Sequence, residues 1–235
     1  MDRRSFIESC AARVGSLSVA SLPAAAWAED AQPREYAKAL LVDEQRRPFK
    51  ASSLQPQTNY VFHYPYEATP VFLLDLGKAA EPAALSTKGS ERYAWPGGVG
   101  PRRSIVAFSA ICAHRLVYPT REVSFISFRK TRATKGVRDQ LIHCCSENSQ
   151  YDPAQGARVL SGPAEQPLCA VLLSHDPRTD TLTAWGTLGG ELFSEFFRKY
   201  EMRLSLEMGA RAVNPVADQS VVSELSHFCR NTIQC

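Results

Sequence analysis

The chain has 235 residues, enough for one ordinary domain with extensions at its ends, and 44% of them are hydrophobic against 22% charged. This balance is typical of a globular protein and excludes an intrinsically disordered chain. The formal net charge is only +3, and no stripe of Lys and Arg recurs along the sequence. We therefore expect no nucleic acid among its partners.

The N-terminal segment 1–28 has the features of an export signal. A pair of arginines near the start precedes a modestly apolar run rich in alanine and serine, which ends in the small-x-small pattern Ala26-Trp27-Ala28. These features resemble a twin-arginine signal, with an ordinary amphipathic helix as the alternative. The run contains three serines and a proline, which makes a poor membrane span. We expect a periplasmic protein that is anchored in the membrane only if the signal stays uncleaved.

The next segments predict a β-rich domain at 59–190 that follows a polar N-terminal extension at 29–58. Short apolar or alternating runs bounded by Pro and Gly are typical of antiparallel strands. These runs lie at 60–64, 71–76, 104–109, 123–128, 140–143, 170–173 and 181–185. Their close spacing predicts an all-β fold of the sandwich or barrel type.

The C-terminal segment 191–235 has a different pattern, which predicts a helical extension. Large apolar side chains recur there at helical spacing, namely Leu192, Phe193, Phe196, Phe197, Tyr200 and Leu204. An amphipathic helix is expected to pack on the β-domain, or alternatively on a partner protein. Cys229 and Cys235 are close enough in sequence to close a small disulfide loop.

The cysteines in the middle of the chain point to metal chemistry. Seven cysteines occur, and the first would leave with the signal; the other six could form three disulfides in an oxidising compartment. However, Cys112 is followed two residues later by His114, and Cys144 and Cys145 directly follow His143. Thiolates and imidazoles at such spacing can bind zinc or an iron–sulfur cluster.

Two segments resemble the ligand loops of the Rieske [2Fe–2S] protein family. The first runs from Ser104 to His114, and the second contains Ser149-x-Tyr151-Asp152, followed by Gly-Pro-Ala at 162–164 and Pro-Leu at 167–168. The resemblance covers about 60–185 and, with the export signal, is greatest to the small Rieske subunit of arsenite oxidase. It implies a Rieske-type antiparallel β-sandwich or barrel, with a small cluster-binding subdomain at about 105–168.

The resemblance also implies roles for individual residues. Cys112 and Cys144 would bind one iron of the cluster, and His114 the other. Ser149 and Tyr151 match positions whose hydroxyl groups donate hydrogen bonds to a bridging sulfide and to a ligand cysteine sulfur. Such donors stabilise the reduced cluster and raise its potential.

The fourth ligand departs from the family pattern. Where the family has a second histidine, this chain has Glu147. A carboxylate binds ferric iron, but its negative charge lowers the potential relative to imidazole. Cys145 and His143 are alternative fourth ligands, and the loss of a normal cluster is a further alternative. The disulfide that usually joins the two loops is missing, because its positions are Val117 and Ser146.

These features together predict a non-catalytic electron-transfer subunit. The resemblance implies a larger catalytic oxidoreductase subunit as electron donor and a cytochrome c or similar protein as acceptor. A degenerate Rieske fold that serves as a structural or assembly subunit is the main alternative. A quinol-oxidising Rieske subunit is disfavoured because only His114 would bind the second iron. A zinc site formed by Cys112, His114, Cys144 and Cys145 would leave the Ser-x-Tyr-Asp and Gly-Pro-Ala matches unexplained.

Overall fold

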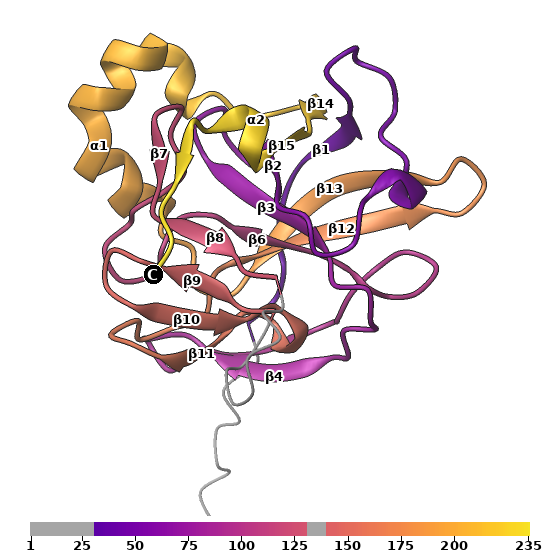
Figure 1. Ribbon diagram of the computed structural model, residues 1–235, viewed down its shortest axis with the longest axis horizontal. Helices are drawn as coiled ribbons and strands as arrows, with labels where there is room; N and C mark the ends of the chain where they lie inside the picture. The colour runs from indigo at the N-terminus through magenta and orange to yellow at the C-terminus, as the bar shows by residue number, and fades with distance from the viewer. Residues whose placement is uncertain (1–30, 131–139) are drawn as a thin grey trace, which may run out of the picture.

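The computed structural model describes residues 31–130 and 140–235. The export signal expected at 1–28 therefore lies outside the described residues. The described chain is mostly β-structure, with one longer helix, α1 (Phe193–Met208), near the C-terminus (Figure 1). The all-β class expected from the sequence is confirmed. In the residues described, no helix combines the length and apolar character needed to cross a membrane.

The largest sheet is a nearly closed barrel with the strand order β14-β1-β13-β12-β6-β3-β2-β15. In chain order its strands are β1 (Arg34–Val42), β2 (Tyr60–His63), β3 (Pro70–Asp75), β6 (Ile105–Ser109), β12 (Ala170–Asp176), β13 (Thr181–Leu188), β14 (Asp218–Val221) and β15 (Ser223–Glu224). All neighbours are antiparallel except β1 and β14, which are parallel. The two edge strands are separated in sequence only by Val222, and Ser220 of β14 hydrogen-bonds to the backbone of His63 in β2. The sheet therefore curls back on itself.

A second, four-stranded sheet is built from the chain between β6 and β12, in the order β11-β10-β9-β8. Its strands are β8 (Ile126–Phe128), β9 (Ile142–Cys144), β10 (Ser149–Asp152) and β11 (Arg158–Ser161). In Figure 1 this sheet lies below the barrel as a separate layer. It falls inside the segment 105–168, where the sequence predicts a cluster-binding subdomain.

The remaining elements are short. Two small sheets pair β4 (Ala83–Ser86) with β5 (Arg92–Trp95), and β7 (Val123–Ser124) with β16 (Asn231–Thr232). The short helices are η1 (Ala51–Ser53), η2 (Pro153–Gln155), η3 (Gly209–Val213) and α2 (Leu225–Phe228).

Strand β3 explains how one strand supports two hydrophobic cores. Successive side chains of a strand point to opposite faces of the sheet. Accordingly, Phe72 and Leu74 belong to the core that β3 shares with the small sheet, while Val71 and Leu73 belong to the core inside the barrel. Because both faces are covered, the strand is buried along its whole length. This burial is why its sequence is continuously apolar instead of alternating.

The alternating run at 123–128 forms two short strands where the sequence predicts one. Strand β7 pairs with β16 and β8 pairs with β9, and Phe125 lies between them with 39% of its surface exposed. The run thus changes partners at Phe125. Its period of two is kept on both sides of the break, so the sequence pattern does not reveal the change.

The C-terminal segment 191–235 is only partly helical. Helix α1 packs on the chain just after β6, where Phe193 and Phe196 share a core with Ile111 and Tyr118. This intramolecular packing is the one favoured by the sequence. Beyond Met208, however, the segment contributes three strands, β14, β15 and β16, to the sheets. These strands are too short to carry a readable alternation.

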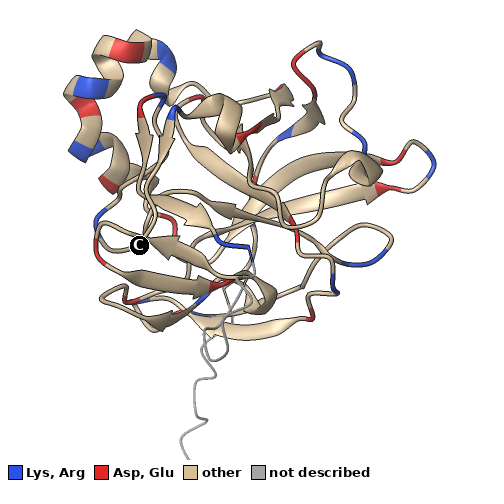
Figure 2. Ribbon diagram, viewed as in Figure 1, with Lys and Arg blue, Asp and Glu red and all other residues tan. Residues whose placement is uncertain are grey.

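Among the described residues, charged residues of both signs are interspersed over the fold (Figure 2). Figure 2 shows Lys and Arg interspersed with Asp and Glu over the strands and loops, and both signs along α1. On that helix Arg203 contacts Glu207 one turn away and Glu122 on the neighbouring loop. Such alternation agrees with the small net charge of the sequence.

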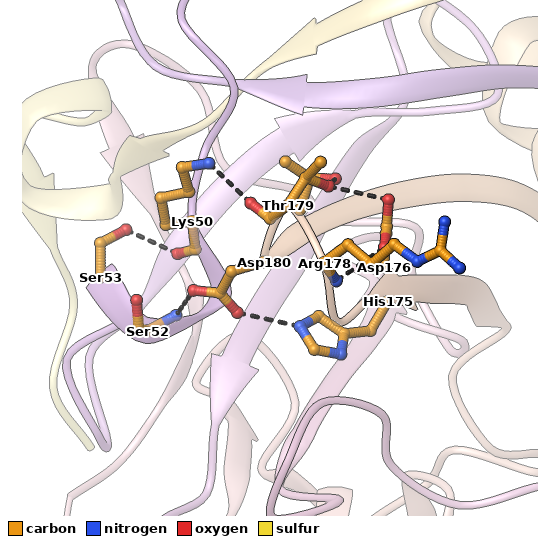
Figure 3. Close-up of polar contacts among 9 residues, drawn as sticks. Lys50, Ser52, Ser53, His175, Asp176, Arg178, Thr179 and Asp180 are labelled. Carbon is orange, nitrogen blue, oxygen red and sulfur yellow. Dashed lines mark hydrogen bonds and ion pairs between the residues drawn. The ribbon is translucent and has the colours of Figure 1, made fainter.

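A polar network attaches the β12–β13 hairpin to η1 (Figure 3). Asp180 in the hairpin turn accepts hydrogen bonds from the backbone N–H of Ser52, at 3.0 Å, and from Nε2 of His175, at 2.9 Å. Lys50 Nζ donates to the carbonyl of Thr179 at 2.6 Å. The hydrogen bonds from Ser52, and then the one from His175, lower the pKa of Asp180 to about 2. His175 therefore has a structural partner in this network.

Replacing Asp180 with asparagine is expected to make the free energy of unfolding depend less on pH in the acid range. A carboxyl group whose pKa is lowered by folding stabilises the fold above its unfolded pKa, about 3.9, and this contribution is lost as the pH falls through the folded value. The difference in unfolding free energy between wild type and Asp180→Asn should therefore shrink as the pH falls below about 4. Urea unfolding across this range measures this difference, with the substitution of exposed Asp218 in β14 by asparagine as a control. A difference that stays constant with pH would contradict the assignment.

Candidate metal centre

Two loops at one end of the small sheet bring Cys112 and Cys144 together. The first loop (110–122) follows β6, and the second (145–148) joins β9 to β10. Both cysteine side chains are fully buried and hydrogen-bond to each other, without forming a disulfide. Strands β7 and β8 lie between the two cysteines in the sequence, so it is the fold that brings their sulfurs together.

Backbone turns direct N–H groups toward both sulfurs. In the first loop, Cys112 N donates to Val117 O at 2.8 Å and Leu116 N donates to Cys112 O at 2.9 Å. This tight turn directs the N–H groups of His114 and Arg115 at the Cys112 sulfur. In the second loop, residues 146 and 147 donate their N–H groups to the Cys144 sulfur in the same way. The turn there is closed by Asn148 with a φ of +57°, a conformation that asparagine tolerates.

The two thiols have opposite pKa shifts. The pKa of Cys112 is lowered, first by the hydrogen bond from the Cys144 thiol and then by the Tyr151 hydroxyl and backbone N–H groups, although burial opposes the shift. The pKa of Cys144 is raised by its hydrogen bond to Cys112, by burial and by the charge of Cys112. The pair therefore favours one thiolate that shares a proton with the second sulfur. Two adjacent buried sulfurs of this kind suit a soft metal ion.

Tyr151 and Ser149, both on β10, connect this sulfur pair to its surroundings. The Tyr151 hydroxyl lies 3.4 Å from the Cys112 sulfur and accepts the N–H of Ala113 at 3.3 Å. Its own proton is therefore available to the sulfur. The Ser149 hydroxyl instead accepts the N–H of Ala164 at 3.2 Å. Both residues are fully buried, so these contacts exclude water from the sulfurs.

His114 presents an unsatisfied ring nitrogen. Among the described residues, its Nδ1 atom is buried and has no hydrogen-bond partner. Buried polar atoms in folded proteins are nearly always hydrogen-bonded, and an exception calls for a specific explanation. A coordinating nitrogen is such an explanation, because a metal ion would take the lone pair that no protein donor satisfies.

Glu147 lies at the tip of the second loop and is ion-paired. Its carboxylate is 3.4 Å from Nε of Arg115, and 34% of its side chain is exposed. The ion pair joins the two loops, since Arg115 directly follows His114. Sequence reasoning did not single out Arg115, because an isolated arginine in a loop carries no pairing signal.

Cys145 and His143 do not face the sulfur pair. Cys145 forms a disulfide with Cys235, which removes it from the candidate ligands in this state and also from the four-residue zinc site considered above. His143 and Cys144 are consecutive in β9, so their side chains point to opposite faces of the small sheet. Burial and the charge of Arg129 lower the pKa of His143.

The disulfide corrects the pairing expected at the C-terminus. Cys235 bonds to Cys145, 90 residues earlier, and Cys229 is a buried free thiol. Short sequence spacing suggested Cys229 with Cys235, but the chain after α2 runs as an extended strand beside β7 and carries its end to the second loop. Nothing in the cysteine spacing could have identified this long-range pair.

Over the described ranges, no three His, Cys, Asp or Glu side chains lie close enough together to hold one metal ion. In a Rieske centre each iron takes two protein ligands, so that arrangement requires no such triplet. Cys112 and Cys144 meet as a pair, and the buried Nδ1 of His114 is on the same loop as Cys112.

No protein-family model matches the chain. Among solved structures, it is similar to the soluble domain of the Rieske protein II from Sulfolobus acidocaldarius, with 28% sequence identity and a TM-score of 0.47. The similarity covers 65% of this chain and 78% of that chain. The function proposed for this chain rests on its own residues.

Proposed function

We propose that the chain is a Rieske-type iron–sulfur protein that transfers single electrons. The observation that carries this proposal is the buried pair of Cys112 and Cys144, brought from two loops to hydrogen-bond with each other beneath backbone and Tyr151 donors. These two sulfurs would hold one iron of a [2Fe–2S] cluster, and Nδ1 of His114 would bind the other. Such a cluster takes up and releases one electron at a time.

The chain's own groups favour the more negative, reduced state. The N–H groups that point at each sulfur and the hydroxyl of Tyr151 place positive ends of dipoles toward the charge that arrives with the electron. Hydrogen bonds to ligand sulfurs raise the reduction potential of iron–sulfur centres. The complete burial of both cysteines and of Tyr151 limits solvent reorganisation.

Glu147 is the proposed fourth ligand. It lies on the same loop as Cys144, and its carboxylate is one of the oxygen donors that ferric iron accepts. To bind iron it would exchange its ion pair with Arg115 for a bond to the metal. A carboxylate in place of imidazole adds negative charge, which lowers the potential and offsets part of the effect of the Tyr151 donor.

The variant Glu147→Ala tests this ligand. We expect it to contain less iron and acid-labile sulfide than the wild type, because the second iron would keep only His114. Electron paramagnetic resonance of the reduced protein should also show a changed signal in whatever cluster remains. Glu165→Ala is the matched control, since Glu165 is an exposed carboxylate that is also ion-paired, with Lys88. A full cluster with an unchanged spectrum in Glu147→Ala would show that Glu147 is not a ligand.

The proposed setting is a periplasmic oxidoreductase complex of the arsenite oxidase type. A larger catalytic subunit would supply the electrons, and a cytochrome c or similar protein would accept them. The twin-arginine pattern at 1–28 supports this setting, because that route exports proteins that are already folded around a cofactor. The chain itself would be a non-catalytic subunit, which an uncleaved signal would anchor in the membrane.

A second candidate is a cluster-free structural or assembly subunit. The Glu147–Arg115 ion pair favours it, because this pair joins the two loops without a metal. Iron and sulfide content of the exported wild-type protein separates the two candidates. About two irons and two sulfides per chain support the electron carrier, and none supports the structural subunit.

A further inference from the structure

We propose that the Cys145–Cys235 disulfide is a thiol–disulfide exchange site that fastens the C-terminal strand to the second loop. The reacting partner would be a dithiol reductant, with Cys235 as the sulfur that is attacked and Cys145 as the leaving group. The exchange chemistry is independent of the proposed cluster. Only its consequence for Cys144 rests on the proposed function.

Besides the disulfide, the C-terminal strand is held by short backbone pairing, by Arg129 and by a side-chain hydrogen bond from Asn231 to the carbonyl of Glu122. Strand β16 pairs with β7 through only two residue pairs, and beyond it the N–H of Ile233 donates to Ser124 O at 2.9 Å. In Figure 1 this strand, the yellow end of the chain, runs down beside β7 and ends next to β8 and β9. A two-residue parallel pairing is weak by itself, so the covalent bond is the main attachment of the chain end.

The same contacts link the chain end to the second loop. The N–H of Cys145 donates to Phe125 O at 2.6 Å, just beyond the β7 residues that pair with β16. The disulfide and this hydrogen bond therefore fix Cys145 from two sides. Its neighbour Cys144 belongs to the sulfur pair. Whatever holds Cys145 thus also restricts the position of Cys144.

Arg129 places a positive charge at the disulfide. Its Nη2 atom lies 2.8 Å from the Cys145 sulfur, 3.7 Å from the Cys235 sulfur and 2.9 Å from the carbonyl of Ile233. The guanidinium group is thus nearest to the sulfur of Cys145. A sulfur that departs as an anion leaves more readily beside a cation. This asymmetry makes Cys145 the better leaving group.

The two cysteines also differ in exposure to solvent, and here Cys235 is the more accessible. Cys235 is an exposed residue, whereas Cys145 is only half exposed. An external thiolate can therefore approach Cys235. It would form a mixed disulfide with the Cys235 sulfur as the Cys235–Cys145 bond breaks and Cys145 leaves as a thiolate. The second thiol of the reductant then attacks the mixed disulfide, so two thiols form on the protein and one disulfide forms on the reductant.

Reduction would release the chain end and loosen the second loop. With the covalent attachment gone, residues 230–235 keep the short backbone pairing, the Arg129 contacts and the side-chain hydrogen bond from Asn231 to the carbonyl of Glu122. The turn that directs N–H groups at Cys144 would then open more often. The Cys145–Cys235 disulfide would therefore be both the reactive site and the bond that restrains the second loop.

Reduction of the folded, exported protein tests the exchange site. Wild type is treated with glutathione or dithiothreitol without denaturant, free thiols are alkylated, and peptides are analysed by mass spectrometry. We expect Cys145 and Cys235 to be unmodified before treatment, and both to be alkylated after dithiothreitol. With glutathione, the mixed disulfide should lie on Cys235. The variant Arg129→Lys, which keeps the charge without the planar fork, should react within about threefold of wild type, and Arg129→Ala more slowly.

The loop is followed by amide hydrogen exchange. Backbone amides of 144–148 should exchange about tenfold faster after reduction and in Cys235→Ser. The control is Cys229→Ser, which replaces a nearby free cysteine and keeps the Cys145–Cys235 disulfide. The alkylation of Cys145 and Cys235 is expected whether or not iron is bound, so a failure of the cluster proposal leaves that test intact. Reduction that requires urea, a mixed disulfide on Cys145, or unchanged loop exchange would overturn the proposal.

Discussion

Replacing Cys144 with serine is expected to remove iron and acid-labile sulfide from the exported protein almost completely. A serine hydroxyl stays protonated where a thiol forms a thiolate, so the buried pair would keep only the sulfur of Cys112. The loss would be nearly complete because both sulfurs belong to the same iron in the proposed centre. Metal analysis, sulfide assay and visible absorption of the purified variant measure it.

Cys169→Ser is the matched control for this substitution. Cys169 is also buried, and its sulfur hydrogen-bonds to the backbone carbonyls of Ala170 and Leu188, both at 3.7 Å. A serine hydroxyl can make the same contacts, so iron content should stay at the wild-type level. Stoichiometric iron in Cys144→Ser, or equal loss in both variants, would contradict the assignment of the sulfur pair.

Replacing Gly162 with alanine is expected to lower the free energy of unfolding by about 2–5 kcal/mol. Gly162 has a φ of +88°, which costs an alanine about 1–2 kcal/mol. An added Cβ would also lie 2.5 Å from the Cα of Ser149 and 2.6 Å from the carbonyl of Asn148. Those neighbours are backbone atoms, so relief requires the turn between β9 and β10 to move, at about 1–3 kcal/mol.

Gly209→Ala separates these two contributions. Gly209 also has a positive φ, +61°, but an added Cβ there meets nothing within 4 Å. Its ψ of −144° is a conformation that essentially only glycine adopts, so its substitution should cost the conformational part alone, about 1–3 kcal/mol. Chemical unfolding of both variants gives the comparison. Equal losses would mean that the 162–164 segment does not press against the second loop.

The close approach of Gly162 also bears on the sulfur pair. The segment that follows it is held by the Ser149 hydroxyl through Ala164 N. Ser149 in turn pairs across the hairpin with Cys144. An alanine that displaces this segment should therefore disturb the cysteine loop as well as the global stability.

Much of the barrel could be predicted because its strands are either apolar throughout or alternate. The runs at 60–64, 71–76, 104–109 and 170–173 all became strands of the main sheet. Sequence reasoning missed β1, which lies in the expected polar extension and is largely exposed in its first half, together with strands that are short or polar. Strand β10 reads Ser-Gln-Tyr-Asp, for instance, and only the small-sheet core explains why its Ser149 and Tyr151 are buried.

In the candidate centre, too, the sequence reveals the residues that are close along the chain but not the pairs that the fold brings together. The two-residue spacing of Cys112 and His114 is a local signal, and the fold brings Cys144 to it. The partners of Glu147 and Cys145 are long-range. Arg115 and Cys235 come from other loops, and neither spacing nor composition determines which residue a loop tip will meet.

The position of β14 and β15 has a consequence for the order in which the protein can fold during synthesis. The strands that close the barrel lie at 218–224, and they pair with β1 and β2, which lie more than 150 residues earlier in the sequence. Until those residues have been made, β1 and β2 have open edges on which the backbone groups are unpaired. The barrel can therefore be completed only after residues 218–224 have been translated.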